Sequence, residues 1–167
     1  MAYEDVFRAL ASHKARYLVA GGVAVNLHGV PRMTVDLDLL VDLSPANARR
    51  VVGALSSIGF EPRVPVPFVD FAEAAKRDAW IREKGMMVFS AHHPKRPWEI
   101  VDLFVDPPVE FSAAWRRRKR VSIGGVTVPI VSIQDLMAMK RKAAREQDLS
   151  DLEALEKLRR EMRNGGS

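Results

Sequence analysis

Hydrophobic and polar residues alternate with two different periods along the first quarter of the chain. Residues 4–14 carry apolar side chains at helical spacing, and residues 16–20 form a short apolar run typical of a buried strand. A second helix is expected over 23–28, directly after the pair Gly21-Gly22. The segment 34–43 then changes to a period of two, which predicts a strand with two unlike faces.

The rest of the chain continues this alternation of predicted helices and strands. In chain order we expect a helix over 46–57, a proline-limited edge strand within 60–68, a helix over 71–82, strands over 86–91 and 98–105, a short helix over 110–118, a hairpin around Gly124-Gly125 and two final helices. This order predicts an α/β protein with a sheet flanked by helices. We expect an α/β core over 1–131, C-terminal helices packed on it over 132–163, and a flexible tail over 164–167.

Composition narrows the class of protein without naming a function. Of the 167 residues, 47% are hydrophobic and 28% charged, as in ordinary globular proteins. No apolar run is long enough to span a membrane and no secretory signal is recognisable, so we expect a cytoplasmic protein. The absence of cysteine excludes disulfides, thiolate metal sites and cysteine nucleophiles. The net charge of +5 favours acidic partners such as nucleotides or RNA.

Three aspartates interrupt strands that are otherwise apolar. Asp36 and Asp38 lie two residues apart in a predicted strand, so both point to one side at a spacing of roughly 6.6 Å. Asp102 interrupts a later strand in the same way. Buried carboxylates are costly unless they are paired or hold a metal, and Mg²⁺ is held by a few carboxylates together with substrate phosphates. The sequence therefore predicts a metal site for phosphoryl transfer, with Asp42 as a solvated neighbour outside it.

Gly21-Gly22 adds a second feature of such a site. A strand that ends in two glycines and opens a helix presents backbone N–H groups to an anion, and the missing side chains allow a phosphate to approach. Thirteen residues separate this pair from Asp36. Alone, the two glycines would be interpreted more readily as a turn.

These motifs together resemble the nucleotidyltransferase superfamily related to DNA polymerase beta. The closer resemblance is to its minimal bacterial branch of AbiEii-like and MNT-type toxins, through the pattern GGxAxxxHGxxRxTxDLD from Gly21 to Asp38. A second pattern, DLxxMKxxAxRxxDxxD, runs from Asp135 to Asp151. The resemblance extends over residues 17–158, although fewer helices follow Lys140 than in most AbiEii-like toxins.

The resemblance implies a metal-dependent enzyme that moves a nucleoside monophosphate from an NTP to an acceptor hydroxyl and releases pyrophosphate. Asp36, Asp38 and Asp102 would be the catalytic, metal-holding residues, with two Mg²⁺ ions or Mn²⁺ in their place. The implied nucleotide-binding residues are Gly21, Gly22, Arg32 and Lys140. The implied acceptors are tRNA or another RNA, a partner protein, or a small molecule, and a toxin would have an antitoxin partner.

Other interpretations stay open at this point. The chain could be a non-catalytic nucleotidyltransferase-fold module that docks a partner or senses a nucleotide. Arg32 could pair with a carboxylate or bind phosphate, and Lys140 could belong to a solvated basic helix face. The basic run Arg116–Arg120 could be a solvated helix end or an RNA contact. A nucleic-acid-binding protein without chemistry would leave the three aspartates unexplained.

Overall fold

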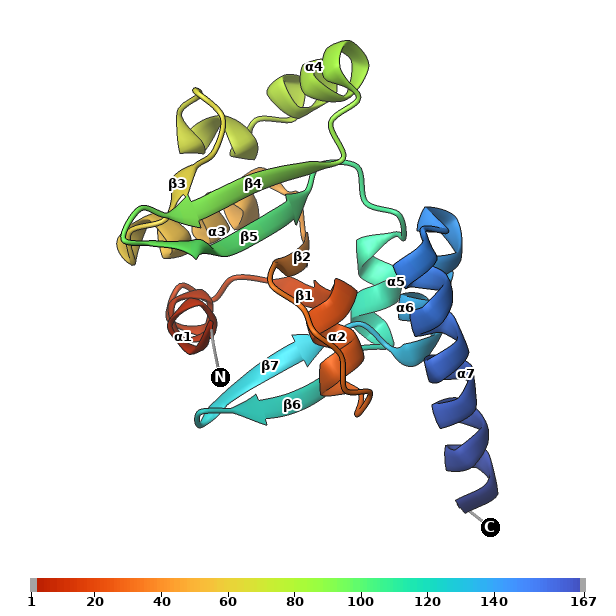
Figure 1. The fold of residues 1–167 in the computed structure, drawn as a ribbon. Helices are drawn as coiled ribbons and strands as arrows, with labels where there is room; N and C mark the ends of the chain where they lie inside the picture. Colours follow the sequence, from red (N-terminus) through yellow and green to blue (C-terminus); the bar gives the residue numbers. More distant parts are fainter. Residues whose placement is uncertain (1–2, 166–167) are drawn as a thin grey trace.

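The computed structural model describes residues 3–165, which fold around one mixed sheet of seven strands (Figure 1). The order across the sheet is β3-β4-β5-β2-β1-β7-β6. The strands are β1 (Tyr17–Ala20), β2 (Leu37–Val41), β3 (Glu61–Pro62), β4 (Val88–His93), β5 (Arg96–Phe104), β6 (Lys119–Ile123) and β7 (Val126–Ile130). The predicted α/β fold is confirmed, and the proline-rich strand β3 lies at an edge, where a missing N–H is tolerated.

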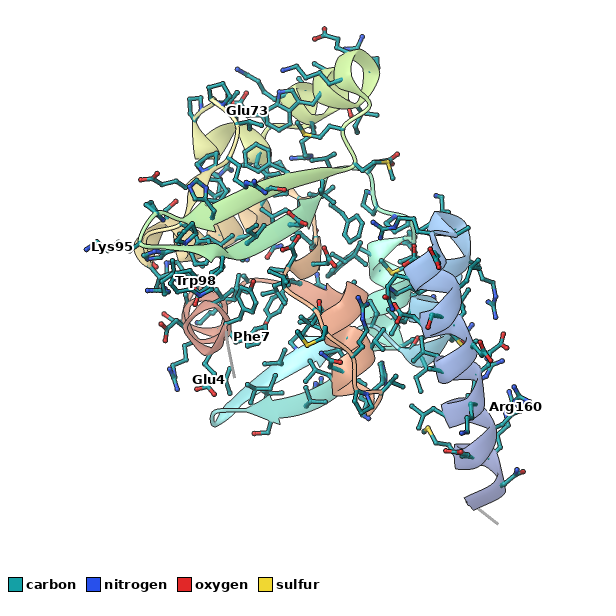
Figure 2. The ribbon with its side chains drawn as sticks, viewed as in Figure 1. Glu4, Phe7, Glu73, Lys95, Trp98 and Arg160 are labelled. Carbon is teal, nitrogen blue, oxygen red and sulfur yellow. The ribbon has the colours of Figure 1, made fainter. Side chains whose placement is uncertain are left out.

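Helices flank this sheet and supply much of its apolar cover. They are α1 (Glu4–Ser12), α2 (Gly21–Leu27), α3 (Pro45–Ser57), the 3₁₀ helix η1 (Phe68–Ala72), α4 (Ala74–Lys84), α5 (Phe111–Arg116), α6 (Ile133–Ala143) and α7 (Glu146–Gly165). The apolar stripe of α1 is buried, with Phe7 fully enclosed (Figure 2). The helix expected over 71–82 is divided in two, because η1 ends at Ala72 and α4 begins at Ala74.

The centre of the sheet sets the geometry of the predicted site. β2 runs antiparallel to β1 and parallel to β5. Its register with β5 places Asp38 directly opposite Asp102. β2 begins at Leu37, so Asp36 lies one residue before the strand. As a central strand, β2 is covered on both faces, which explains why Leu40 is buried although it shares a face with Asp38.

The two C-terminal helices pack on each other beside the sheet. Ser132 caps α6 by accepting a hydrogen bond from the backbone N–H of Asp135 (3.0 Å), as the sequence predicts. Leu136 of α6 and Leu155 of α7 are fully buried. The far half of α7 extends away from the other elements (Figure 1). α7 continues to Gly165, so the first half of the tail expected over 164–167 is helical, and residues 166–167 lie outside the described residues.

Within residues 3–165, no helix has the length and apolar character that crossing a bilayer requires.

Candidate active site

Three carboxylates face one cavity at the centre of the sheet. Asp38 and Asp102 come from neighbouring parallel strands, which lie roughly 4.8 Å apart, and Asp36 comes from the loop that enters β2. All three line a cavity of about 990 Å³. The cavity also contains the other residues that the sequence indicates, namely Gly21, Gly22, Arg32 and Lys140. These residues therefore line one cavity, and the role of each of them stays a prediction.

The carboxylates are held in an environment that disfavours their negative charge. Burial, which has the largest effect, and the negative charges of Asp102 and Asp36 together raise the pKa of Asp38 to about 7, although Lys140 and Arg145 act in the opposite direction. Burial also raises the pKa of Asp102, again with a contribution from Asp36. A bound cation would remove this repulsion, so the electrostatics of the cavity favour cation binding.

Two hydroxyl groups that the sequence analysis did not single out hold this centre in place. Ser90 Oγ, opposite Asp102 on β4, donates a hydrogen bond to Asp102 Oδ1 and partly offsets the rise in its pKa. The hydroxyl of Tyr3 donates to the carbonyl of Val35 (2.6 Å) and accepts from the backbone N–H of Ile100 (3.2 Å). The alternation of apolar and polar residues along β4 could have indicated Ser90. Tyr3 is too far in sequence from the three aspartates for a local pattern to indicate it.

The two glycines are explained first by close packing. Gly21 has a φ of +62°, and a Cβ atom there would overlap the carboxylate of Asp38. A Cβ on Gly22 would lie 2.6 Å from Thr34 Oγ1 and 2.8 Å from Arg32 Nη1, which is closer than real contacts allow. The glycines therefore make room for the carboxylate and for the loop that carries Arg32. Their backbone also lines the cavity, as phosphate binding would require.

An ion-pair network around the buried Lys140 lines the same cavity. Lys140 Nζ lies 3.0 Å from Asp148 Oδ1 and 2.9 Å from Asp151 Oδ2. Arg32 pairs with Asp151 at 2.9 Å, and Arg145 pairs with Asp148 at 2.9 Å. Lys140 is buried, so the interpretation of a solvated basic face is wrong. Arg32 pairs with a carboxylate, as one of its two interpretations proposed, and also lines the cavity.

The donor set fits a divalent cation whose coordination is completed by a substrate. Among residues 3–165, no group of three or more histidine, aspartate or glutamate side chains is placed so that it could hold a metal ion. Carboxylate oxygens facing one polar cavity are nevertheless the ligands that Mg²⁺ prefers, and Mg²⁺ often needs only one or two of them besides substrate phosphates. Asp36, Asp38 and Asp102 fit that arrangement.

The basic run Arg116–Arg120 is only partly available to a ligand. Arg117 forms a bidentate pair with the buried Asp135 at 3.0 and 2.7 Å, which holds the first turn of α6. The guanidinium of Arg118 lies 4.0 Å from the centre of the Trp115 ring. The residues of the run that remain exposed without such packing are Arg116, Lys119 and Arg120.

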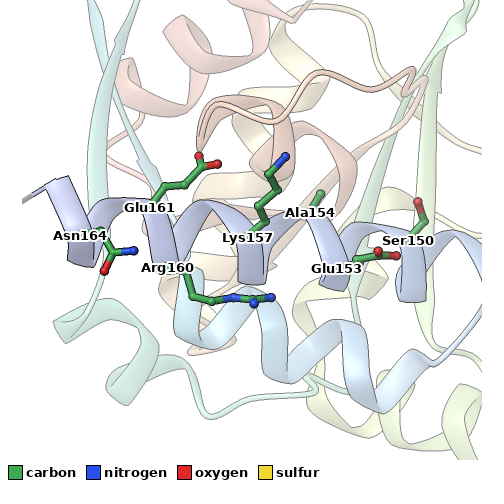
Figure 3. A pocket seen from close by; sticks show the side chains of 7 residues that line it. All are labelled: Ser150, Glu153, Ala154, Lys157, Arg160, Glu161 and Asn164. Carbon is green, nitrogen blue, oxygen red and sulfur yellow. The ribbon is translucent and has the colours of Figure 1, made fainter.

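A second hollow lies along α7 (Figure 3). Its volume is about 620 Å³ and it is lined only by side chains of that helix, among them Lys157, Arg160 and Glu161. None of the predicted site residues lines it. The larger cavity at the sheet centre is therefore the candidate active site.

Comparison with solved structures identifies the fold. The fold is similar to the lincosamide antibiotic adenylyltransferase LnuA in its lincomycin-bound crystal structure, with a TM-score of 0.60, 14% identity, and 92% of this chain and 93% of that chain covered. It is also similar to ANT(2'')-Ia in complex with adenylyl-2''-tobramycin, with a TM-score of 0.56, 15% identity, and 98% and 95% covered. A nucleotidyltransferase-like protein from Paracoccidioides brasiliensis matches with a TM-score of 0.56, 19% identity, and 90% and 71% covered. The chain has a nucleotidyltransferase fold.

The family follows from the sequence itself. Residues 5–163 match the family described as nucleotidyl transferase AbiEii toxin, type IV TA system. The protein belongs to the AbiEii nucleotidyltransferase family, so the resemblance seen in its motifs is confirmed. No individually curated protein shows significant sequence similarity to it.

Proposed function

We propose that the protein transfers a nucleoside monophosphate from an NTP to an acceptor hydroxyl and releases pyrophosphate, with a divalent metal. The observation that carries the proposal is the register of β2 with β5, which sets Asp38 opposite Asp102 in the cavity that Asp36 also lines. Arg32, Lys140 and Arg145 line the same cavity, where their positive charges would attract the anionic triphosphate.

Each carboxylate has a role that its surroundings support. Asp36, Asp38 and Asp102 would hold Mg²⁺, or Mn²⁺ in its place. The metal would supply neutralisation of phosphate charge and polarisation of the reacting phosphoryl group. Asp102 would also accept the proton of the acceptor hydroxyl, since burial raises its pKa and makes it a better base. Ser90 would keep its carboxylate oriented through the hydrogen bond to Oδ1.

The nucleotide phosphates would lie near the glycines and near the cations Arg32 and Lys140. Gly21 and Gly22 would accommodate them closely with their backbone. An ammonium group has three donors, of which Lys140 uses two for Asp148 and Asp151, so one is left for a phosphate oxygen. Arg32 would add a second cation from the facing loop.

The alternative is a non-catalytic module that senses a nucleotide or docks a partner. The presence of all three carboxylates in one cavity favours catalysis over this alternative. Incubation with α-labelled NTPs, Mg²⁺ or Mn²⁺ and a cell extract separates the two: transfer labels an extract component and releases pyrophosphate. We expect Asp102→Asn to abolish labelling while the exposed control Asp78→Asn retains it. Bound NTP without labelled product would favour the sensing module, and labelling by Asp102→Asn would refute the site.

The acceptor is proposed to be an RNA hydroxyl, with a partner protein or a small molecule as the alternatives. The net charge of +5 and the exposed cations Arg116, Lys119 and Arg120 favour RNA. If they contact phosphates, neutralising all three should flatten the log–log salt dependence of tRNA binding by roughly two units. An unchanged slope would favour the other acceptors. A toxin role with an antitoxin partner, and a cytoplasmic location, are part of the same proposal.

A further inference from the structure

Apolar side chains that line the active-site cavity are exposed to solvent. Among residues 3–165, seven large hydrophobic side chains are exposed, and three of them line this cavity: Met33 at 91% exposure, Val35 at 62% and Met87 at 61%. Phe104 adds a half-buried ring to the same wall. Apolar side chains that gather at one place on a surface mark a binding site more often than isolated ones do. We call these four residues the apolar wall.

The backbone of the apolar wall is held by hydrogen bonds. The carbonyl of Val35 accepts from the hydroxyl of Tyr3 (2.6 Å), and the carbonyl of Met33 accepts from Arg32 Nε (3.2 Å). The carbonyl of Met87 accepts from the backbone N–H of Val105 (3.1 Å). Exposed apolar side chains on an anchored backbone form a surface that exists before a ligand arrives, and this preorganisation lowers the entropic cost of binding.

The apolar wall adjoins the carboxylates. Val35 directly precedes Asp36 in the chain. Phe104 follows Asp102 by two residues on β5, so both side chains leave the strand on the same side, roughly 6.6 Å apart along it. A ligand whose phosphate lies at the carboxylates therefore has the apolar wall nearby for an uncharged part of the same molecule. The charged residues of the cavity suit a triphosphate, whereas an uncharged flat group suits the apolar wall.

We propose that the apolar wall, Met33, Val35, Met87 and Phe104, is a nucleobase-binding subsite; this rests on the proposed nucleotidyl transfer. Thioethers adapt to an aromatic face and make favourable sulfur–aromatic contacts, and the Phe104 ring offers a surface for stacking. None of the four side chains carries a hydrogen-bonding group that reads the polar edge of a base. The subsite should therefore accept all four bases with little discrimination. The base belongs either to the NTP or to an RNA acceptor.

The test compares Met33→Ala/Met87→Ala with Met162→Ala, an exposed methionine on α7 that does not line the cavity. Calorimetry with Mg²⁺ measures the binding of tripolyphosphate and of the α,β-methylene analogues of ATP, GTP, CTP and UTP. For the wild type we expect the four analogues to bind within about tenfold of each other, since base-edge contacts are missing. In the double variant all four should weaken by roughly tenfold, as expected for lost apolar contact, with tripolyphosphate binding unchanged.

The outcomes assign the source of the base or overturn the subsite. Weaker binding of the analogues alone assigns the apolar wall to the base of the NTP. Unchanged analogue binding with weaker binding of a tRNA pool assigns it to a base of the acceptor. No difference from Met162→Ala in either experiment, or an equal loss for tripolyphosphate, overturns the proposal. A wild type that binds the analogues but transfers no label would refute the proposed transfer alone, because the binding experiments still decide the subsite.

Discussion

Gly21→Ala should damage the candidate site through one identifiable contact. Gly21 lies where β1 passes into α2, and its φ of +62° puts the missing side chain against the carboxylate of Asp38. Gly85, which ends α4, has nearly the same φ of +60°, and a Cβ there would meet nothing within 4 Å. Gly85→Ala is therefore a matched control, since it shares the backbone conformation of Gly21 but has no steric contact.

The expected magnitudes follow from separating these two effects. A non-glycine residue in the left-handed conformation costs about 1–2 kcal/mol, and both variants carry this loss. Forcing an extra methyl group into packed surroundings costs typically a further 1–3 kcal/mol, and Gly21→Ala alone carries that loss. The unfolding free energy should thus fall by about 2–5 kcal/mol for Gly21→Ala and about 1–2 kcal/mol for Gly85→Ala. Displacement of the Asp38 carboxylate should also reduce transfer by about 100-fold.

Denaturant unfolding and NTP transfer, measured on both variants, check this reasoning. Gly85→Ala should keep wild-type transfer under conditions where it is folded. If both variants lose the same stability and Gly21→Ala still transfers at the wild-type rate, Asp38 can move away without consequence. The close packing of Gly21 would then have no functional meaning.

Three further predictions concern charged groups. Asp38→Asn should be more stable than the metal-free wild type, because the raised pKa of Asp38 makes the wild type lose stability as the pH rises from about 4 to about 7. The difference in unfolding free energy between the two proteins should grow over that range to at most about 4 kcal/mol and then stay constant. Unfolding curves that show the same difference at every pH would contradict this prediction. Arg117→Ala should lower the melting temperature because it removes the bidentate cationic partner of the buried Asp135, whereas thermal melts of exposed Arg116→Ala should shift little; equal melts would show that the pair at α6 is dispensable. Lys140→Met should lose at most about 3–5 kcal/mol, because Asp148 keeps Arg145 and Asp151 keeps Arg32 as partners. Adding Asp148→Asn should recover part of that loss in chemical denaturation, since it removes one of the two carboxylates that Lys140 neutralised; purely additive losses would argue against the pairing.

Local sequence patterns determined much of the secondary structure and the identity of the carboxylates. Period-two alternation predicted β2, and proline placed β3 at an edge. The Ser132 cap and the glycine hairpin were also predictable, because capping and tight turns depend on residues a few positions apart. Asp36, Asp38 and Asp102 stood out because a charged residue in an apolar strand conflicts with its local surroundings.

Only the tertiary structure decided which side chains meet. The register of β2 with β5 sets Asp38 opposite Asp102, although they are 64 positions apart in the sequence. Lys140 is part of a basic helix face in the sequence, yet the packing of α6 on α7 buries its ammonium between two aspartates of α7.

The sequence alone could not predict the partner of Arg117 or the apolar wall. The basic run gave no sign that Arg117 is committed to Asp135, 18 positions away. The apolar wall draws on the loop before β2, the residue before β4 and the end of β5, and in the sequence each contribution looks like an ordinary strand residue. Local propensity acts over a few residues, whereas burial, ion pairing and a shared cavity depend on how distant elements pack. For that reason the sequence alone indicated the chemistry of the site, and the packing of α6, α7 and the central strands determined which groups surround it.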